Sequence, residues 1–169
     1  MSRALVAALR EQGGTLAELA AEDAAEDAAE VSEPAHLGAA GPRAAGARHE
    51  YELLLEMILE GSRLHYGTPR VVRTEDRDLA LLLGDQLYAL GLSRLAVLGD
   101  LDATAELADV ISLVAQAHGS QDPALADAVW EAGAVAVGWG ATEELRDAKA
   151  LARAGDPSAA GALRAAARR

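Results

Sequence analysis

The stretch that decides the fold is RHEYELLLEMILEGSRLH, at residues 48–65. Leu54, Met57, Ile58 and Leu64 recur at the spacings that place them on one face of an α-helix. Three glutamates also repeat at every fourth position, at 52, 56 and 60. The stretch predicts a strong helix, and the glutamates raise the question of whether they bind a metal ion.

A second long helix is predicted at 75–98, after a loop at 66–73. Leucines follow helical spacing along it, at positions 79, 82, 83, 87, 90, 95 and 98. Gly84 and Gly91 lie seven residues apart and therefore roughly on the same face. Each glycine costs about 1 kcal/mol relative to alanine in a helix. We expect the two glycines to admit the close approach of another helix, or of a ligand, to the backbone.

Further helices are marked by their capping residues. Gly99-Asp100 ends the second helix and opens one at 101–118, and Asp122-Pro123 opens another that runs to about 138. Thr142 opens a helix that Gly155 ends, and Asp156-Pro157 opens the last. The tight connections predict an all-α fold, an antiparallel helical bundle over 48–169.

The first 47 residues are predicted to be simpler. A short helix is expected at 3–11, and a capping box of Thr15 and Glu18 predicts a helix over 15–30. These form an N-terminal acidic region, 1–30, and residues 31–47, rich in glycine and proline, are expected to be a linker. We expect a single globular domain overall.

Composition limits the classes of partner. The net charge is −12 and the pI about 4.7, which disfavours binding to nucleic acid or to an anionic membrane surface. The sequence has no cysteine, no secretion signal is recognised, and no apolar run was seen to approach the roughly 20 residues of a membrane span. We therefore expect a cytoplasmic protein without a membrane span.

Two sets of carboxylates are candidate metal ligands. The first, in AEDAAEDAAE at 21–30, shares a helix with Leu16 and Leu19, so we interpret it as a solvated helix face. The second is the set of glutamates at 52, 56 and 60, which resembles the carboxylates of metal-binding bundles. No Glu-x-x-His motif accompanies them, and we favour a solvated or partner-facing stripe.

Residues 48–99 resemble the trans-polyprenyl diphosphate synthase family. The sequence GDQLYALGLSRLAVLG at 84–99 is similar to the family's Gly-Asp helix, and Leu64-His65 matches the end of the preceding helix. AELADVISLVAQAH at 105–118 is loosely similar to the family's next helix. The resemblance covers about half of the chain and implies an isoprenoid-synthase-like but truncated bundle.

The chain departs from this family where the metal binds. Tyr66 and Gly67 stand in place of the first two aspartates, and the second aspartate-rich motif does not occur in the sequence. In the family those aspartates hold Mg²⁺ ions that stabilise the departing diphosphate. The resemblance therefore implies a non-catalytic accessory or small subunit in isoprenoid synthesis, such as that of quinone side chains.

The resemblance also implies a partner, either a catalytic prenyltransferase subunit or a second copy of the chain. The helix at 75–98 would offer it an apolar face, and Asp85 is expected to be structural. No residue is assigned to catalysis or metal binding, and no cofactor is expected. The candidates to face a substrate or a partner are His65, Tyr66, Arg70, Arg73, Asp85 and Gln86.

Two alternatives stay open. The first is an active minimal prenyltransferase, or another helical-bundle enzyme, that uses carboxylates such as Glu56 and Glu60, and Mg²⁺ would be its cofactor. The second is a helical binding or regulatory protein unrelated to isoprenoids.

Overall fold

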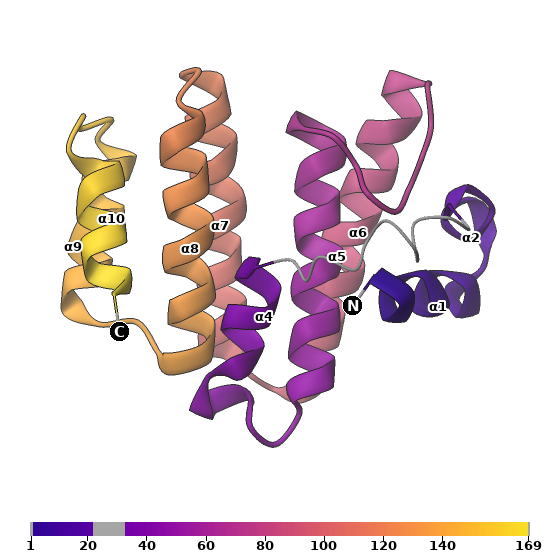
Figure 1. Ribbon diagram of the computed structural model, residues 1–169, viewed down its shortest axis with the longest axis horizontal. Helices are drawn as coiled ribbons and strands as arrows, with labels where there is room; N and C mark the ends of the chain where they lie inside the picture. The colour runs from indigo at the N-terminus through magenta and orange to yellow at the C-terminus, as the bar shows by residue number, and fades with distance from the viewer. Residues whose placement is uncertain (1, 22–32, 169) are drawn as a thin grey trace. The chain divides into compact units, whose positions relative to one another are not determined.

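The computed structural model describes residues 2–21 and 33–168, and over this part of the chain the fold is all-α, as predicted (Figure 1). The chain divides into two compact units. The first comprises the residues up to His36 together with His49–Leu98, and the second comprises Leu37–Arg48 and the residues from Gly99 on. The bundle predicted over 48–169 is thus shared between two units, each with its own core.

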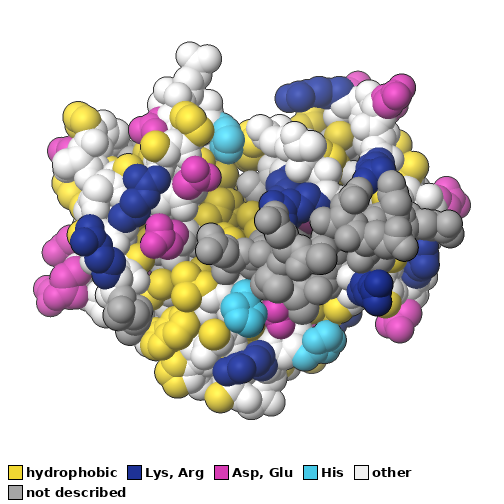
Figure 2. Space-filling view, in the orientation of Figure 1, with side chains coloured by type: hydrophobic (Ala, Val, Ile, Leu, Met, Phe, Trp, Pro, Cys, Tyr) yellow, Lys and Arg dark blue, Asp and Glu magenta, His cyan; other side chains and the backbone are white. Residues whose placement is uncertain are grey.

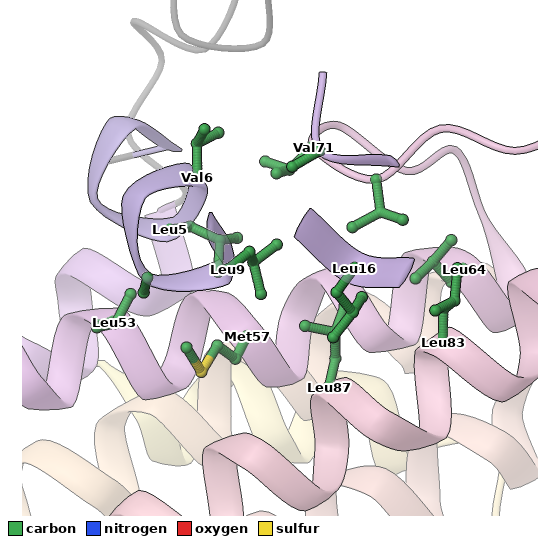
Figure 3. Packing of buried hydrophobic residues seen from close by; sticks show 13 residues of the cluster. Leu5, Val6, Leu9, Leu16, Leu53, Met57, Leu64, Val71, Leu83 and Leu87 are labelled. Carbon is green, nitrogen blue, oxygen red and sulfur yellow. The ribbon is translucent and has the colours of Figure 1, made fainter. Parts of the chain in front are cut away.

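The first unit is built around α5 (Arg48–Tyr66). Every residue from Leu53 to Ser62 is buried, so α5 has no solvated face along these three turns. Around it lie α1 (Ser2–Gln12), α2 (Gly14–Leu19) and α6 (Arg77–Leu98). Figure 3 shows the leucines of α1 and α2 directed toward Leu53 and Met57 of α5 and toward Leu87 of α6. Burial of these side chains is the main stabilising contribution.

Glycines set the distance between α5 and α6. A Cβ atom on Gly84 would lie 2.6 Å from the His65 ring, and one on Gly91 would lie 2.5 Å from Ile58 Cγ1. In the other direction, a Cβ on Gly61 would lie 2.9 Å from the Gly84 carbonyl oxygen. The prediction that Gly84 and Gly91 admit the close approach of another helix is confirmed, and that helix is α5.

The N-terminal region differs from its prediction. The helix expected from Thr15 starts at Gly14 and ends at Leu19, and its N-cap is Gly13, which makes no side-chain capping bond. The chain then turns extended, because Ala20 pairs with Val72 in an isolated antiparallel bridge. The acidic run lies, apart from Ala21, outside the described residues.

The second unit contains α7 (Leu101–Gly119), α8 (Pro123–Trp139), α9 (Glu143–Arg153) and α10 (Ala159–Ala167). Helix α8 packs against both α7 and α10, and α10 packs against α9. The predicted N-caps are confirmed, since Asp100, Asp122 and Thr142 each accept a hydrogen bond from the backbone N–H three residues on. The last helix begins later than predicted, at Ala159, because the Asp156 carboxylate instead accepts bonds from Ser158.

The predicted linker is largely ordered helix. It forms α4 (Glu33–Ala40) and a 3₁₀ turn at Pro42–Ala44. Its glycines lie against α8, and a Cβ on Gly41 would overlap the backbone of Gly138. The glycines that suggested a flexible linker therefore serve a tight backbone contact.

A cluster of charges around the buried Lys149 joins α7 to α9 in the same unit. Lys149, 6% exposed, donates to Glu106 (2.7 Å) and to Asp109 (2.9 Å), and Arg153 lies 2.7 Å from Asp109. Burial opposes ionisation of Asp109, but its bonds to Arg153 and Lys149 outweigh that effect and lower the pKa of the carboxyl. The ammonium group of Lys149 is therefore paired with two carboxylates, which explains how it can be buried. We assign the cluster a structural role.

Helix α6 is long enough and apolar enough to cross a membrane by length and composition alone. The expectation that no apolar stretch reaches that length is therefore wrong for α6. Core helices of soluble proteins pass the same test, although only 28% of the apolar window of α6 is buried in the structure. The finding directs attention to the uncovered side of α6.

We predict that Gly138→Ala destabilises the protein. The new Cβ would meet the Gly38 carbonyl oxygen at 2.5 Å, and a backbone atom cannot rotate away. Overpacking of this kind costs about 1–3 kcal/mol, which thermal unfolding would detect as a lower Tm. Gly161→Ala in α10 is the matched control, because nothing lies within 4 Å of its Cβ position, and it should leave Tm unchanged or raise it. Equal melting temperatures for the two variants would contradict the close contact.

Candidate functional site

The most constrained side chain near the predicted site is Glu60 of α5. Its Oε1 atom accepts hydrogen bonds from three successive backbone N–H groups, those of Arg70 (2.8 Å), Val71 (2.6 Å) and Val72 (3.1 Å). Its Oε2 atom accepts a longer bond from Arg63, at 3.4 Å. Glu60 is fully buried, and these donors replace the water it has lost. One carboxylate therefore orders the loop between α5 and α6.

Glu56 lies one helical turn earlier and has a contrasting environment. It is 2% exposed, and its Oε1 atom has no hydrogen-bond partner. Desolvation by burial is the main cause that raises the pKa of the Glu56 carboxyl, and the neighbouring charge of Glu60 acts in the same direction. The positive charges of Arg63 and Arg70 oppose the shift without cancelling it. The pair thus places the Glu60 carboxylate, with its three backbone donors, beside a Glu56 carboxyl whose Oε1 atom has no hydrogen-bond partner.

The predicted solvated or partner-facing glutamate stripe is therefore wrong at these two positions. The sequence contained a signal of this, because leucine, methionine and isoleucine occupy all the positions from 53 to 59 except that of Glu56. A helix that is apolar all round is buried on all sides. The side chain of Glu52, the third member, is 13% exposed, and its Oε1 atom lies 3.4 Å from Nδ1 of His36.

His65 and Asp85, two of the predicted site residues, are brought together by the close contact of α5 and α6. The His65 Nε2 atom lies 3.0 Å from Asp85 Oδ1, at ion-pair distance, yet it makes no hydrogen bond in this geometry. The imidazole lies over Gly84 and stacks on the Tyr88 ring at 5.3 Å, with 3° between the planes. Packing therefore holds the His65 ring between the helices, while the Asp85 carboxylate remains largely exposed.

The other predicted site residues lie around this pair. Tyr66 ends α5, is 40% exposed, and has its ring 5.5 Å from that of His65. Gln86 is an exposed residue of α6, next to Asp85. Arg70 and Arg73 lie in the connecting loop with exposed side chains, and it is their backbone N–H groups that hold the loop in place.

Tyr88 was not predicted as part of this region. Its side chain is hydrogen-bonded to that of Ser62, and burial is the main cause that raises the pKa of Tyr88 to about 12. The Tyr88 hydroxyl is therefore neutral at physiological pH and serves as a structural hydrogen-bonding group. Its position four residues after Gly84, one turn along the same helix, was the available sequence signal.

The side of α6 opposite the glycines is open to solvent. Leu82 is 66% exposed and Val97 is 87% exposed, and both lie on the side away from Gly84 and Gly91. Asp85, Gln86 and Ala89 are exposed between them. The two large exposed apolar side chains make this side of α6 a candidate association surface.

In the two described stretches, no group of three or more histidine, aspartate or glutamate residues is arranged to hold a metal ion. Basic side chains lie among acidic and hydrophobic ones on the face shown in Figure 2, without gathering into one basic patch. The geometry thus offers a buried carboxylate that orders the loop, Glu60, and a side of α6 that exposes two large apolar side chains.

We predict that Glu60→Ala unfolds the loop or destabilises the whole protein. The buried N–H groups of Val71 and Val72 and the part-buried one of Arg70 would lose their acceptor. Each unpaired buried donor costs about 1–3 kcal/mol, so the total loss should be about 2 kcal/mol or more. Urea denaturation provides the measurement. Glu50→Ala is the matched control on the same helix, because Glu50 is 42% exposed and its ion pair with Arg94 should contribute at most about 1 kcal/mol. A loss at Glu60 no larger than that at Glu50 would contradict the role assigned to it.

No family model matches the sequence, and neither a curated protein nor a solved structure matches it.

Proposed function

We propose that the chain is a polyprenyl-diphosphate-synthase-like protein that acts as a non-catalytic accessory subunit in isoprenoid synthesis, such as that of quinone side chains. The proposal rests on the resemblance of residues 48–99 and on one structural observation. His65, at the end of the helix where the family's metal motif would begin, is packed between two helices beside Asp85. At this position His65 packs against α6 and so contributes to the contact between α5 and α6.

The uncovered side of α6 supports an accessory role. A subunit that acts on another chain needs an apolar surface for it, and Leu82 and Val97 supply such a surface on an ordered helix. The partner we propose is a catalytic prenyltransferase subunit, with a second copy of this chain as the alternative. Hetero-association would place the accessory subunit where it could alter the product length of its partner.

The structure gives less support to the alternative of a minimal prenyltransferase. In that alternative Glu56 and Glu60 would bind the metal ion. However, Oε1 of Glu60 already accepts three backbone hydrogen bonds. A helical binding protein unrelated to isoprenoids would use the same face of α6. Its partner would then be a protein outside isoprenoid synthesis.

A prenyltransferase assay tests the proposal directly. The chain alone, given isopentenyl diphosphate, an allylic diphosphate and Mg²⁺, should form no product. Added to a full-length synthase from the same organism, it should change the product lengths or the turnover rate. Product formation by the chain alone would contradict the accessory role, and no effect on any such synthase would favour the unrelated binding protein.

Substitutions on α6 identify the surface. We predict that Leu82→Glu together with Val97→Glu abolishes the effect on the synthase, because two buried unpaired charges would oppose association. Ala7→Glu, at an exposed position of α1, is the control and should preserve the effect. Circular dichroism should show all the variants folded, since each substitution lies at an exposed position. An unchanged effect in the double variant would remove α6 as the association surface.

A further inference from the structure

Glu56 and Glu60 form a buried carboxyl pair at the base of the loop between α5 and α6. Glu60 has a full set of donors, whereas Oε1 of Glu56 has none. A buried polar atom without a partner is uncommon in proteins and calls for a physical account. Burial also makes a charge on Glu56 costly, because a carboxylate oxygen without a donor is poorly solvated in the protein interior.

The loop beside this pair is tied to the N-terminal segment. The Ala21 N–H donates to the Val71 carbonyl oxygen (2.9 Å), and the Arg73 N–H donates to that of Leu19 (3.1 Å). Val71 and Val72 are at most 1% exposed and belong to the same apolar cluster as Leu16 (Figure 3). A change in the hydrogen bonds between Glu60 and the loop would therefore also alter the packing of the loop against α2 and the residues that follow it.

We propose that Glu56 is a proton-operated latch for the loop between α5 and α6. With Glu56 protonated, Glu60 holds the N–H groups of residues 70–72 and the loop is closed. Ionisation of Glu56 places a second buried negative charge beside Glu60 and competes for Arg63, whose Nη1 atom lies 3.4 Å from Glu60 Oε2. The loop then loosens, together with its two bonds to residues 19–21.

The charges that act on Glu56 determine the direction of the switch. Glu60 repels the ionised form, while Arg63 on α5, Arg70 in the loop and the amino-terminal charge attract it. Burial is the largest effect, and the pKa of Glu56 is raised. Since the closed state favours the proton, its extra stability is present below the ordinary glutamate pKa and is lost as the pH rises through the raised pKa. The latch is closed under acidic conditions and opens with rising pH.

Hydrogen exchange on the full chain tests whether ionisation of Glu56 loosens the loop. The readout is the protection factor of the amides of residues 70–72, corrected for the intrinsic pH dependence of exchange. In the wild-type protein, protection should fall with rising pH, by up to about tenfold for each unit by which the Glu56 pKa differs between the closed and open loop. In Glu56→Gln, which keeps the shape but not the charge, protection should stay high and independent of pH.

Two further measurements make the result decisive. Glu50→Gln, at a partly exposed acid on the same helix that pairs with Arg94, is the control and should behave like the wild type. The carboxyl group of Glu56, followed by NMR in the wild-type protein, should titrate at the pH where loop protection is lost. Any one of three results would contradict the proposal. The first is protection that is independent of pH in the wild type, and the second is a pH dependence that persists in Glu56→Gln. The third is a mismatch between the pH midpoint of the Glu56 titration and that of the loss of protection. The NMR comparison needs no variant, so it holds even if Glu56→Gln fails to fold, and the latch stands or falls independently of the isoprenoid proposal.

Discussion

Three backbone N–H groups on one carboxylate oxygen are the constraint on which the first unit depends. The loop after α5 has neither a helix nor a sheet to pair these groups, and Glu60 supplies the acceptor from inside the core. Once the loop is held, Val71 and Val72 fill the apolar cluster and their strand-like backbone pairs with residues 19–21. The position of α2 thus follows from a side chain forty residues later in the sequence, through hydrogen bonds that local helix propensity does not provide.

The sequence has no phenylalanine, and in both units backbone segments of different elements approach one another closely. Alanine and glycine bury little area per side chain, so helices must approach closely to gain dispersion energy. Gly61 against the Gly84 carbonyl does this in the first unit, and Gly41 against Gly138 does it in the second. Close approach leaves little room for larger side chains, which is why single Cβ atoms at these glycines would overlap atoms of another element.

Local signals in the sequence predicted much of the fold, and they failed where long-range burial decides. Capping residues such as Asp100 and Thr142 act within one turn, so their helices could be assigned from sequence. The buried state of Glu60 depends on a loop ten residues away, and the prediction of a solvated or partner-facing stripe was wrong there. Residues 31–47 were predicted to be a linker because glycine and proline favour turns. Residues 33–40 and 42–44 are helical instead, and Gly38 and Gly41 lie against α8. His65 and Asp85 could be assigned to one region but not to an ion-pair contact, since Gly84 sets that distance.

The structure separates two features that the sequence had combined into one site. His65 is enclosed by Gly84 and Tyr88, so its ring contributes to the joint of the two helices rather than to a solvent-facing reaction centre. One face of the same α6 helix makes this joint, and the other exposes Leu82 and Val97. A partner that bound the exposed face would therefore meet a helix whose position is fixed by glycine contacts and by the loop that Glu60 orders. If the loop loosens when Glu56 ionises, the start of α6 is the part of that surface which would respond first.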